Sequence, residues 1–276
     1  MYKELANGWP VITSKENQYI KMARGLRNKK GRQDCDRFLL EGVRLCEEAL
    51  AINYPLHFGL ISPQLLEDER GLACAEACRK KGIQVFLVNE SIFSFVSCTE
   101  HPQGILLVAE KKHYQLKDFP LYHKGFCLIA DSLQDPGNTG TILRTAYAAG
   151  VGVVILAGLS VDIYNPKTVR ASMGAVLRLP IIIVSGYDRA YQMVKKARMK
   201  VFLATADGEH IYSEENLNIP IAWVLGSEAK GAGIFWQKAA DVTVSLPMAK
   251  GAESLNVSIA AGILLYETAR QKGFPF

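Results

Sequence analysis

The sequence predicts an α/β protein with two domains, a small one followed by a larger one built on a parallel sheet. Short apolar runs alternate with amphipathic stretches along its 276 residues, which is enough chain for two domains. In the second half these runs are continuously apolar, as in strands buried on both faces of a parallel sheet. Hydrophobic residues make up 49% and charged residues 21% of the chain, which excludes general disorder.

The first domain is expected to span residues 1–112. Ile20, Ala23 and Leu26 recur every three residues after Ser14, which predicts a short amphipathic helix that ends at a basic loop, NKKGRQDCD. Four strands are expected at FLLEG, HFGLIS, IQVFLV and QGILLVAE. Helices are expected at VRLCEEALA, near 63–80 and near 90–96.

A polar and aromatic stretch without a clear period, residues 113–124, is expected to be a linker to a second domain at 125–276. In that domain strands are expected at FCLIA, VGVVILA, LPIIIV, KVFLATA, IAWVLG and DVTVSLP. The helical stretches between and after them are expected near 138–149, 167–176, 187–198, 234–240 and 257–271.

The sequence is expected to be that of a cytoplasmic protein, because it shows neither a membrane span nor an export signal. No apolar run is long enough to cross a bilayer, and MYKELANGWP lacks the pattern of a signal peptide. The six cysteines are therefore expected to be reduced. Cys74 and Cys78 have no second Cys/His pair at metal-binding spacing, so we expect small core side chains and no metal site.

Positive charge is concentrated near the N-terminus. Between Lys15 and Arg37 lie eight basic and three acidic residues, a local excess of +5 that equals the excess of the whole chain. Such a cluster suits a polyanion such as nucleic acid, although a solvated helix face would have the same composition. The candidate RNA-binding residues in this segment are Lys21, Arg24, Arg27, Lys29, Lys30 and Arg32.

Three loops that follow predicted strands are rich in glycine and polar residues: DPGNTGTILRTAYAAG, GSEAKGAG and PMAKGAESLNVS. In parallel sheets, ligands bind outside the carboxyl ends of the strands. Each loop also has a purely local explanation. Asn138 could cap the next helix, the glycines of the second loop could serve a tight turn, and Ser254 and Asn256 could cap the last helix.

Taken together, the segments DSLQDPGNTGTILRTAYAAG, WVLGSEAKGAG and LPMAKGAESLNVSIAAGILLYETARQ resemble motifs 1, 2 and 3 of the SpoU (TrmH) family. This family comprises RNA ribose 2′-O-methyltransferases of the SPOUT superfamily. The resemblance covers roughly residues 125–271, and FLLEGVRLCEEAL and HPQGILLVAE are similar to the family's substrate-binding domain. Ala229 stands where glycine is common, which is a small departure in motif 2.

The resemblance implies a SPOUT domain with a trefoil knot, a homodimer, and an N-terminal RNA-binding module of the ribosomal-protein type. It also implies S-adenosylmethionine as cofactor. The cofactor-binding residues that it implies are Leu225, Gly226, Gly231, Leu246, Met248, Ser254 and Leu255. The missing side chain of Gly226 would let the backbone come close to the cofactor.

The catalytic residues that the resemblance implies are Asn138, Arg144, Glu228, Ser254 and Asn256. Asn138 would order the site, and Glu228 would orient Arg144 or the loop. We expect Arg144 to hold the substrate phosphate and ribose rather than to act as a base, because a guanidinium keeps its proton above pH 12.

Methylation of a ribose 2′-hydroxyl in ribosomal RNA is the predicted function. The two-domain layout favours ribosomal over transfer RNA by analogy. Two other functions stay open: an RNA-binding protein without catalysis, and an enzyme that methylates a base. The complete set of catalytic candidates argues against the first, and the pairing of Asn138 with Arg144 in motif 1 argues against the second.

Overall fold

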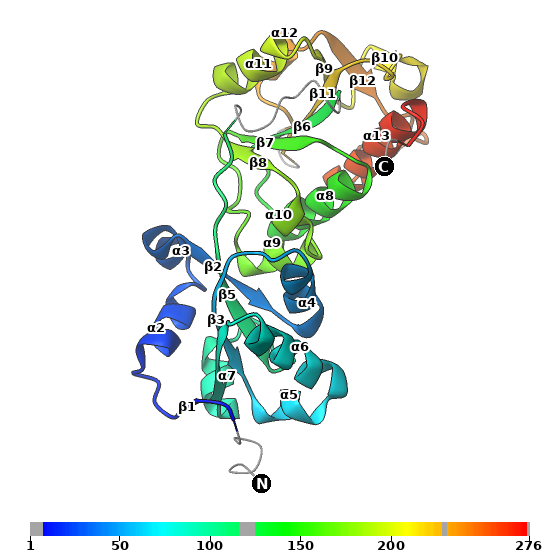
Figure 1. Ribbon diagram of the computed structural model, residues 1–276. Coiled ribbons are helices and arrows are strands. Elements are labelled where there is room, and N and C mark those ends of the chain that lie inside the picture. Colours follow the sequence, from blue (N-terminus) through cyan, green and yellow to red (C-terminus); the bar gives the residue numbers. More distant parts are fainter. Residues whose placement is uncertain (1–7, 116–124, 228–230, 275–276) are drawn as a thin grey trace. The chain divides into compact units, whose positions relative to one another are not determined.

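The computed structural model describes residues 8–115, 125–227 and 231–274 (Figure 1). The chain forms two compact units. Unit 1 consists of Met1–Lys112 together with Tyr164–Leu177, and unit 2 of His113–Ile163 together with Arg178–Phe276. Each unit has its own sheet and its own hydrophobic core.

Unit 1 contains a five-stranded mixed sheet in the order β1-β4-β3-β5-β2. β5 runs antiparallel to β2 and β3, whereas β1, β4 and β3 are parallel. The strands are β1 (Val11–Ile12), β2 (Arg37–Glu41), β3 (Leu56–Ile61), β4 (Gln84–Val88) and β5 (Ile105–Glu110). The helices are α2 (Gln18–Gly25), α3 (Lys29–Cys35), α4 (Val43–Ala51), α5 (Pro63–Glu67), α6 (Glu69–Lys80), α7 (Glu90–Val96) and α9 (Pro166–Ala171).

The predicted amphipathic helix is confirmed as α2, with Ile20 and Ala23 of the helix and Leu26 just beyond its end buried in the core of unit 1. The prediction of a basic loop after this helix was wrong, because the segment NKKGRQDCD contains the helix α3. The guanidinium of Arg32, on α3, donates hydrogen bonds of 2.9 Å to the carbonyls of Leu26 and Arg27. It thereby satisfies backbone acceptors that the end of α2 leaves open.

A segment from the second half of the sequence packs within unit 1. The Tyr164 hydroxyl accepts from the Lys112 amide and donates to the Lys112 carbonyl, both at 3.0 Å. The Tyr164 ring lies 4.5 Å from the ring of Phe38, and Arg170 donates to the Cys98 carbonyl. The expected second domain, residues 125–276, includes Tyr164–Leu177, whereas this segment belongs to unit 1. The domain boundaries stay a prediction. Most of the predicted linker lies outside the described residues.

Unit 2 contains a seven-stranded sheet, wholly parallel, in the order β10-β12-β9-β11-β6-β7-β8. The strands are β6 (Phe126–Asp131), β7 (Val153–Ala157), β8 (Ile181–Ile183), β9 (Lys200–Ala204), β10 (His210–Ile211), β11 (Ile221–Leu225) and β12 (Val242–Ser245). The helices are α8 (Pro136–Ala148), α10 (Ala175–Arg178), which begins in unit 1, α11 (Tyr187–Lys196), α12 (Ile234–Ala239), α13 (Val257–Gln271) and the 3₁₀ turn η3 (Tyr212–Glu214).

The central strands of this sheet are buried along their whole length, as their continuous apolar sequences predicted. Helices α8 and α13 pack against each other (Figure 1). The indole N–H of Trp223, on β11, donates a 2.8 Å hydrogen bond to the buried hydroxyl of Thr268, which fastens α13 to the sheet. The predicted α/β class with a parallel sheet is confirmed, and the trefoil knot stays a prediction.

The six predicted strands of the second half are all present as β6, β7, β8, β9, β11 and β12. β1, β10 and η3 were not predicted, because two or three residues are too few to establish a period. The buried thiols of Cys74 and Cys78 are small core side chains as expected. Within the described ranges, the structure contains no helix with the length and apolar character that a bilayer crossing requires.

Candidate active site

A cavity of about 440 Å³ opens at the carboxyl edge of the parallel sheet in unit 2. Its walls come from the ends of β9, β11 and β12, three neighbouring strands, and from the start of α13. All seven predicted cofactor-binding residues line this cavity: Leu225, Gly226, Gly231, Leu246, Met248, Ser254 and Leu255. Asn256, predicted to be catalytic, also lines it. The structure thus brings motifs 2 and 3 together around one space.

Several cavity residues were not predicted. Ala204, Thr205 and Ala206 form the wall at the end of β9, and Val244 of β12 and Ala260 of α13 complete the apolar part. The strand KVFLATA was predicted, but its end lacks the glycines that marked the other loops. Thr205, a polar residue at the carboxyl end of a buried strand, was the signal available in the sequence.

Gly226 is required by the loop that it begins. A Cβ atom at this position would overlap the backbone of Gly231 and Ala232. The two described ends of the loop are paired, since the Ser227 amide donates to the Gly231 carbonyl at 3.0 Å and the Gly231 amide donates back at 2.9 Å. The missing side chain of Gly226 therefore permits close approach of the protein's own backbone, and its expected approach to the cofactor stays a prediction. Glu228 lies outside the described residues.

A hydrogen bond joins motif 1 to motif 3. Asn256 is the N-cap of α13, and its Oδ1 accepts from the Ser258 amide at 2.8 Å and from the Ser258 hydroxyl at 2.6 Å. Its amide nitrogen donates to Oδ1 of Asn138 at 3.1 Å. Asp135, not Asn138, caps α8, by accepting from the Asn138 amide at 2.7 Å. The Asn138 side chain is therefore directed toward Asn256 rather than used as a cap.

Arg144 is not brought to this junction. It lies on α8 six residues after Asn138, which corresponds to about 240° around a helix, so the two side chains leave α8 on different faces. Arg144 is exposed and does not line the cavity. Within residues 8–115, 125–227 and 231–274, its guanidinium makes no hydrogen bond or ion pair.

The predicted RNA-binding residues differ in how far they are available to a ligand. Arg32 is only 2% exposed and serves the backbone at the end of α2, so its expected contact with RNA is corrected. Arg24 and Arg27 both donate to the Phe95 carbonyl, at 2.7 and 3.1 Å. The Arg24 guanidinium also lies over the Phe95 ring, 4.6 Å from its centroid.

Lys21, Lys29 and Lys30 are exposed. Lys21 forms a 2.6 Å ion pair with Glu16, and its hydrogen bond and charge lower the pKa of the Glu16 carboxyl. Such an exposed pair contributes little to stability and leaves the lysine free to exchange partners. The surface formed by Lys21, Arg24, Arg27, Lys29 and Lys30 is called the basic surface below.

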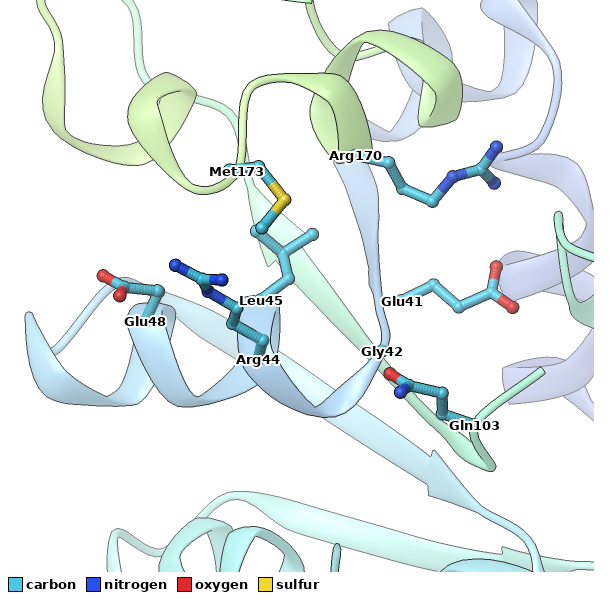
Figure 2. Close-up of a pocket in the computed structure, with 8 residues that line it drawn as sticks. All are labelled: Glu41, Gly42, Arg44, Leu45, Glu48, Gln103, Arg170 and Met173. Atoms are coloured by element: carbon cyan, nitrogen blue, oxygen red, sulfur yellow. The ribbon is translucent and has the colours of Figure 1, made fainter. Parts of the chain in front are cut away.

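A second cavity, of about 230 Å³, lies in unit 1 and contains none of the predicted site residues (Figure 2). Figure 2 shows Arg44, Leu45 and Glu48 on one wall, on α4, and Arg170 and Met173 on another. Its lining combines charged side chains with Leu45 and Met173, and we assign it no catalytic role.

The family model of the SpoU rRNA methylase family matches residues 125–266. The chain belongs to this family. A second model, the MRM3-like substrate binding domain, matches residues 17–107. The two matches cover the sheet of unit 2 and most of the sheet of unit 1, and the predicted linker lies between them.

Relatives and solved structures agree with this membership. The chain is 33% identical over 92% of its length to the 23S rRNA (guanosine(2553)-2′-O)-methyltransferase RlmP of Bacillus subtilis, 97% of which is covered. It is similar to the AdoMet-bound rRNA methyltransferase of Sinorhizobium meliloti, with 31% identity, a TM-score of 0.82, and 94% and 97% of the two chains covered. For the SpoU methyltransferase AviRb of Streptomyces viridochromogenes in complex with AdoMet, the identity is 27%, the TM-score 0.83, and the coverage 93% and 99%.

The predicted family and fold class are confirmed by these matches. The predicted activity, RNA 2′-O-methylation with S-adenosylmethionine, is that of the family and its named relatives. The roles of the individual site residues, the knot and the homodimer stay predictions.

We expect Gly226→Ala to weaken S-adenosylmethionine binding at least tenfold, because the added methyl group forces the Gly231–Ala232 backbone out of the cavity wall. Gly186→Ala is the matched control, since nothing lies within 4 Å of a Cβ atom at Gly186 and its backbone is extended. Isothermal titration calorimetry measures the affinity, and thermal melting reports folding. Equal affinities in the two folded variants would contradict the role of this loop.

Proposed function

We propose that this protein transfers a methyl group from S-adenosylmethionine to a ribose 2′-hydroxyl of ribosomal RNA. One observation carries the proposal: all seven residues that motifs 2 and 3 were expected to contribute line a single cavity, with the Asn138–Asn256 hydrogen bond at the start of α13 beside it. Relatives that cover nearly the whole chain are named for this reaction on 23S rRNA.

The cavity suits a molecule with an apolar ring and polar groups. Its volume is within the range of ordinary small-molecule sites, which are mostly apolar with a few polar groups that fix orientation. Leu225, Val244 and Leu246 supply apolar walls, while Thr205 and Ser254 supply hydroxyls. These residues would hold S-adenosylmethionine, which supplies an electrophilic methyl group on its sulfonium. The protein then has to align a 2′-oxygen with that group.

The side chains at the edge of the cavity supply this alignment. Asn256 is held rigidly by Ser258 on one side and by Asn138 on the other, so its position is fixed before substrate arrives. Preorganised groups cost no rearrangement during the reaction. Arg144 is exposed in the second half of α8, outside the cavity lining, and its fork of N–H donors suits a substrate phosphate. We assign it the positioning of RNA and no proton transfer.

Methyl transfer from tritiated S-adenosylmethionine to ribosomal RNA tests the function. We expect the label on ribose after nuclease digestion, and we expect Arg144→Ala to lower the single-turnover rate by orders of magnitude at unchanged cofactor affinity. Arg144→Lys should recover RNA binding better than rate, because it keeps the charge and loses the bidentate fork. Label on a base would overturn the proposal, and a near-wild-type rate for Arg144→Ala would remove this residue from the mechanism.

RNA is proposed to bind the basic surface of unit 1. Lys29→Glu/Lys30→Glu should weaken RNA binding and reduce the log–log salt slope by about 1.4–1.8, at roughly 0.7–0.9 for each phosphate contact. Lys80→Glu/Lys81→Glu, on exposed residues at the end of α6, makes the same change in charge and serves as control. Filter binding at several salt concentrations measures both. If the two double variants behave alike, only net charge matters and the basic surface is not the RNA site.

A substrate among the ribosomal RNAs is favoured over transfer RNA, because two relatives that cover nearly the whole chain are named for 23S rRNA. A cytoplasmic location is part of this proposal, since the substrate is found there. Comparing 2′-O-methylation maps of ribosomal RNA between wild-type and deletion cells would identify the nucleotide. An unchanged ribosomal map with a lost transfer-RNA site would favour the alternative substrate.

A homodimer is also proposed. α8 and α13 pack together and expose large apolar side chains, with Tyr147 46%, Ile259 54% and Tyr266 45% exposed. We expect Tyr147→Glu/Ile259→Glu to shift the protein from dimer to monomer in sedimentation velocity, because two buried charges would be left without partners. Leu159→Glu, at a position 84% exposed on another part of unit 2, should stay dimeric. A monomeric wild-type protein would overturn this part of the proposal.

A further inference from the structure

Asp131 is a buried carboxylate at the carboxyl end of β6 to which the sequence analysis assigned no role. It is only 1% exposed. One carboxylate oxygen, Oδ2, accepts a 2.8 Å hydrogen bond from the backbone amide of Gly233, and the other, Oδ1, accepts one of 2.8 Å from the Ser132 hydroxyl. Burying a carboxylate is costly unless its oxygens are hydrogen-bonded, so these two contacts are what makes its position tolerable.

Gly226 is the first residue of the loop between β11 and α12, and Gly233 is its last residue. β6 and β11 pair in parallel with Ala130 opposite Leu225, so Asp131 and Gly226 follow the last pair of the two strands. Gly233 is the N-cap of α12 and has no side chain with which to satisfy the helix terminus. The carboxylate of Asp131 therefore fastens this end of the loop to the strand beside it.

This attachment reaches the cavity through the loop's own backbone. Ala232 and Gly231, the two residues before Gly233, pack so closely on Gly226 that no side chain fits between them. Gly231 is in turn paired with Ser227 by two backbone hydrogen bonds. Gly226, Ser227 and Gly231 all line the cavity. A displacement of Gly233 would therefore move three residues of the cavity wall.

Ser132, which donates to the Asp131 carboxylate, is itself held in place by its neighbours. Ser132 has a left-handed backbone with φ of 54°, which a non-glycine residue keeps only when its surroundings impose it. Its amide donates to the Ala157 carbonyl at 3.1 Å, and its hydroxyl lies 3.3 Å from the hydroxyl of Tyr187. A Cβ atom on Gly158 would overlap the Ser132 hydroxyl, so no side chain can intrude there. These contacts orient the Ser132 hydroxyl toward Asp131.

We propose that Asp131 is a positioning residue for the cofactor: by holding the Gly233 amide, it keeps Gly226, Ser227 and Gly231 in the shape that binds S-adenosylmethionine. The inference rests on the proposed function, since it names what maintains that site. Asp131 does not line the cavity and is not assigned any contact with cofactor or RNA.

The test compares Asp131→Ala and Asp131→Asn with wild type in the full-length protein. Asp131→Ala should weaken S-adenosylmethionine binding at least tenfold in calorimetry and raise the KM for the cofactor equally. The single-turnover methylation rate at saturating cofactor should stay within about threefold of wild type, because the reacting groups are intact. Asp131→Asn should restore most of the affinity, because its amide oxygen can accept from Gly233.

Asp241→Ala is the matched control. The Asp241 carboxylate also accepts a backbone hydrogen bond in unit 2, from Val201 at 2.7 Å, and pairs with Lys195, but at the amino end of the sheet. Its loss should lower the melting temperature and leave cofactor affinity unchanged. If Asp131→Ala likewise loses only stability, Asp131 is purely structural and the inference is overturned. A wild-type protein that binds no S-adenosylmethionine would instead overturn the proposed function.

Discussion

The parallel direction of all seven strands in unit 2 is the constraint on which its functional features depend. Because the strands run the same way, each begins at one edge of the sheet and ends at the other. The cavity lies at the edge where β9, β11 and β12 end. β6 pairs with β11, so the loop after it, which leads into α8, starts beside the loop that contains Gly226. Segments more than a hundred residues apart in the chain thus meet at one edge.

Local and functional explanations of the same residue are compatible at this edge. Asn256 caps α13, as a purely local explanation required, and the hydrogen bonds of that cap also orient its amide nitrogen toward Asn138. Gly226 serves the backbone of its own loop, and the loop forms part of the cavity wall. A helix cap or a tight turn is a rigid support, and rigid supports are what a site for small molecules needs.

The buried charged side chains of unit 1, Arg32 and Glu41, hold local backbone and hydroxyl groups and do not form part of a cavity for the cofactor. The Arg32 guanidinium is directed at carbonyls at the end of α2. Glu41 is 8% exposed and accepts hydrogen bonds from the Ser97 and Thr99 hydroxyls and the Cys98 amide, so it holds the segment after α7. Both side chains satisfy backbone or neighbouring polar groups that would otherwise be buried without partners. The basic surface proposed to bind RNA therefore lacks Arg32, which the sequence had placed among its members.

The sequence by itself determined most of the elements, the parallel sheet, the family and seven residues of the cavity in motifs 2 and 3. The elements and the sheet follow from periodicity along the chain, and the segment VRLCEEALA, for example, forms α4 residue for residue. The family and the cavity residues follow from the resemblance of the three motifs. Only the tertiary structure decided that Arg32 is buried, that Tyr164–Leu177 packs in unit 1, and that Asp131 holds the Gly233 amide 102 residues away. The physical reason is that each depends on which distant segments come into contact, and neither propensity nor local spacing encodes that contact.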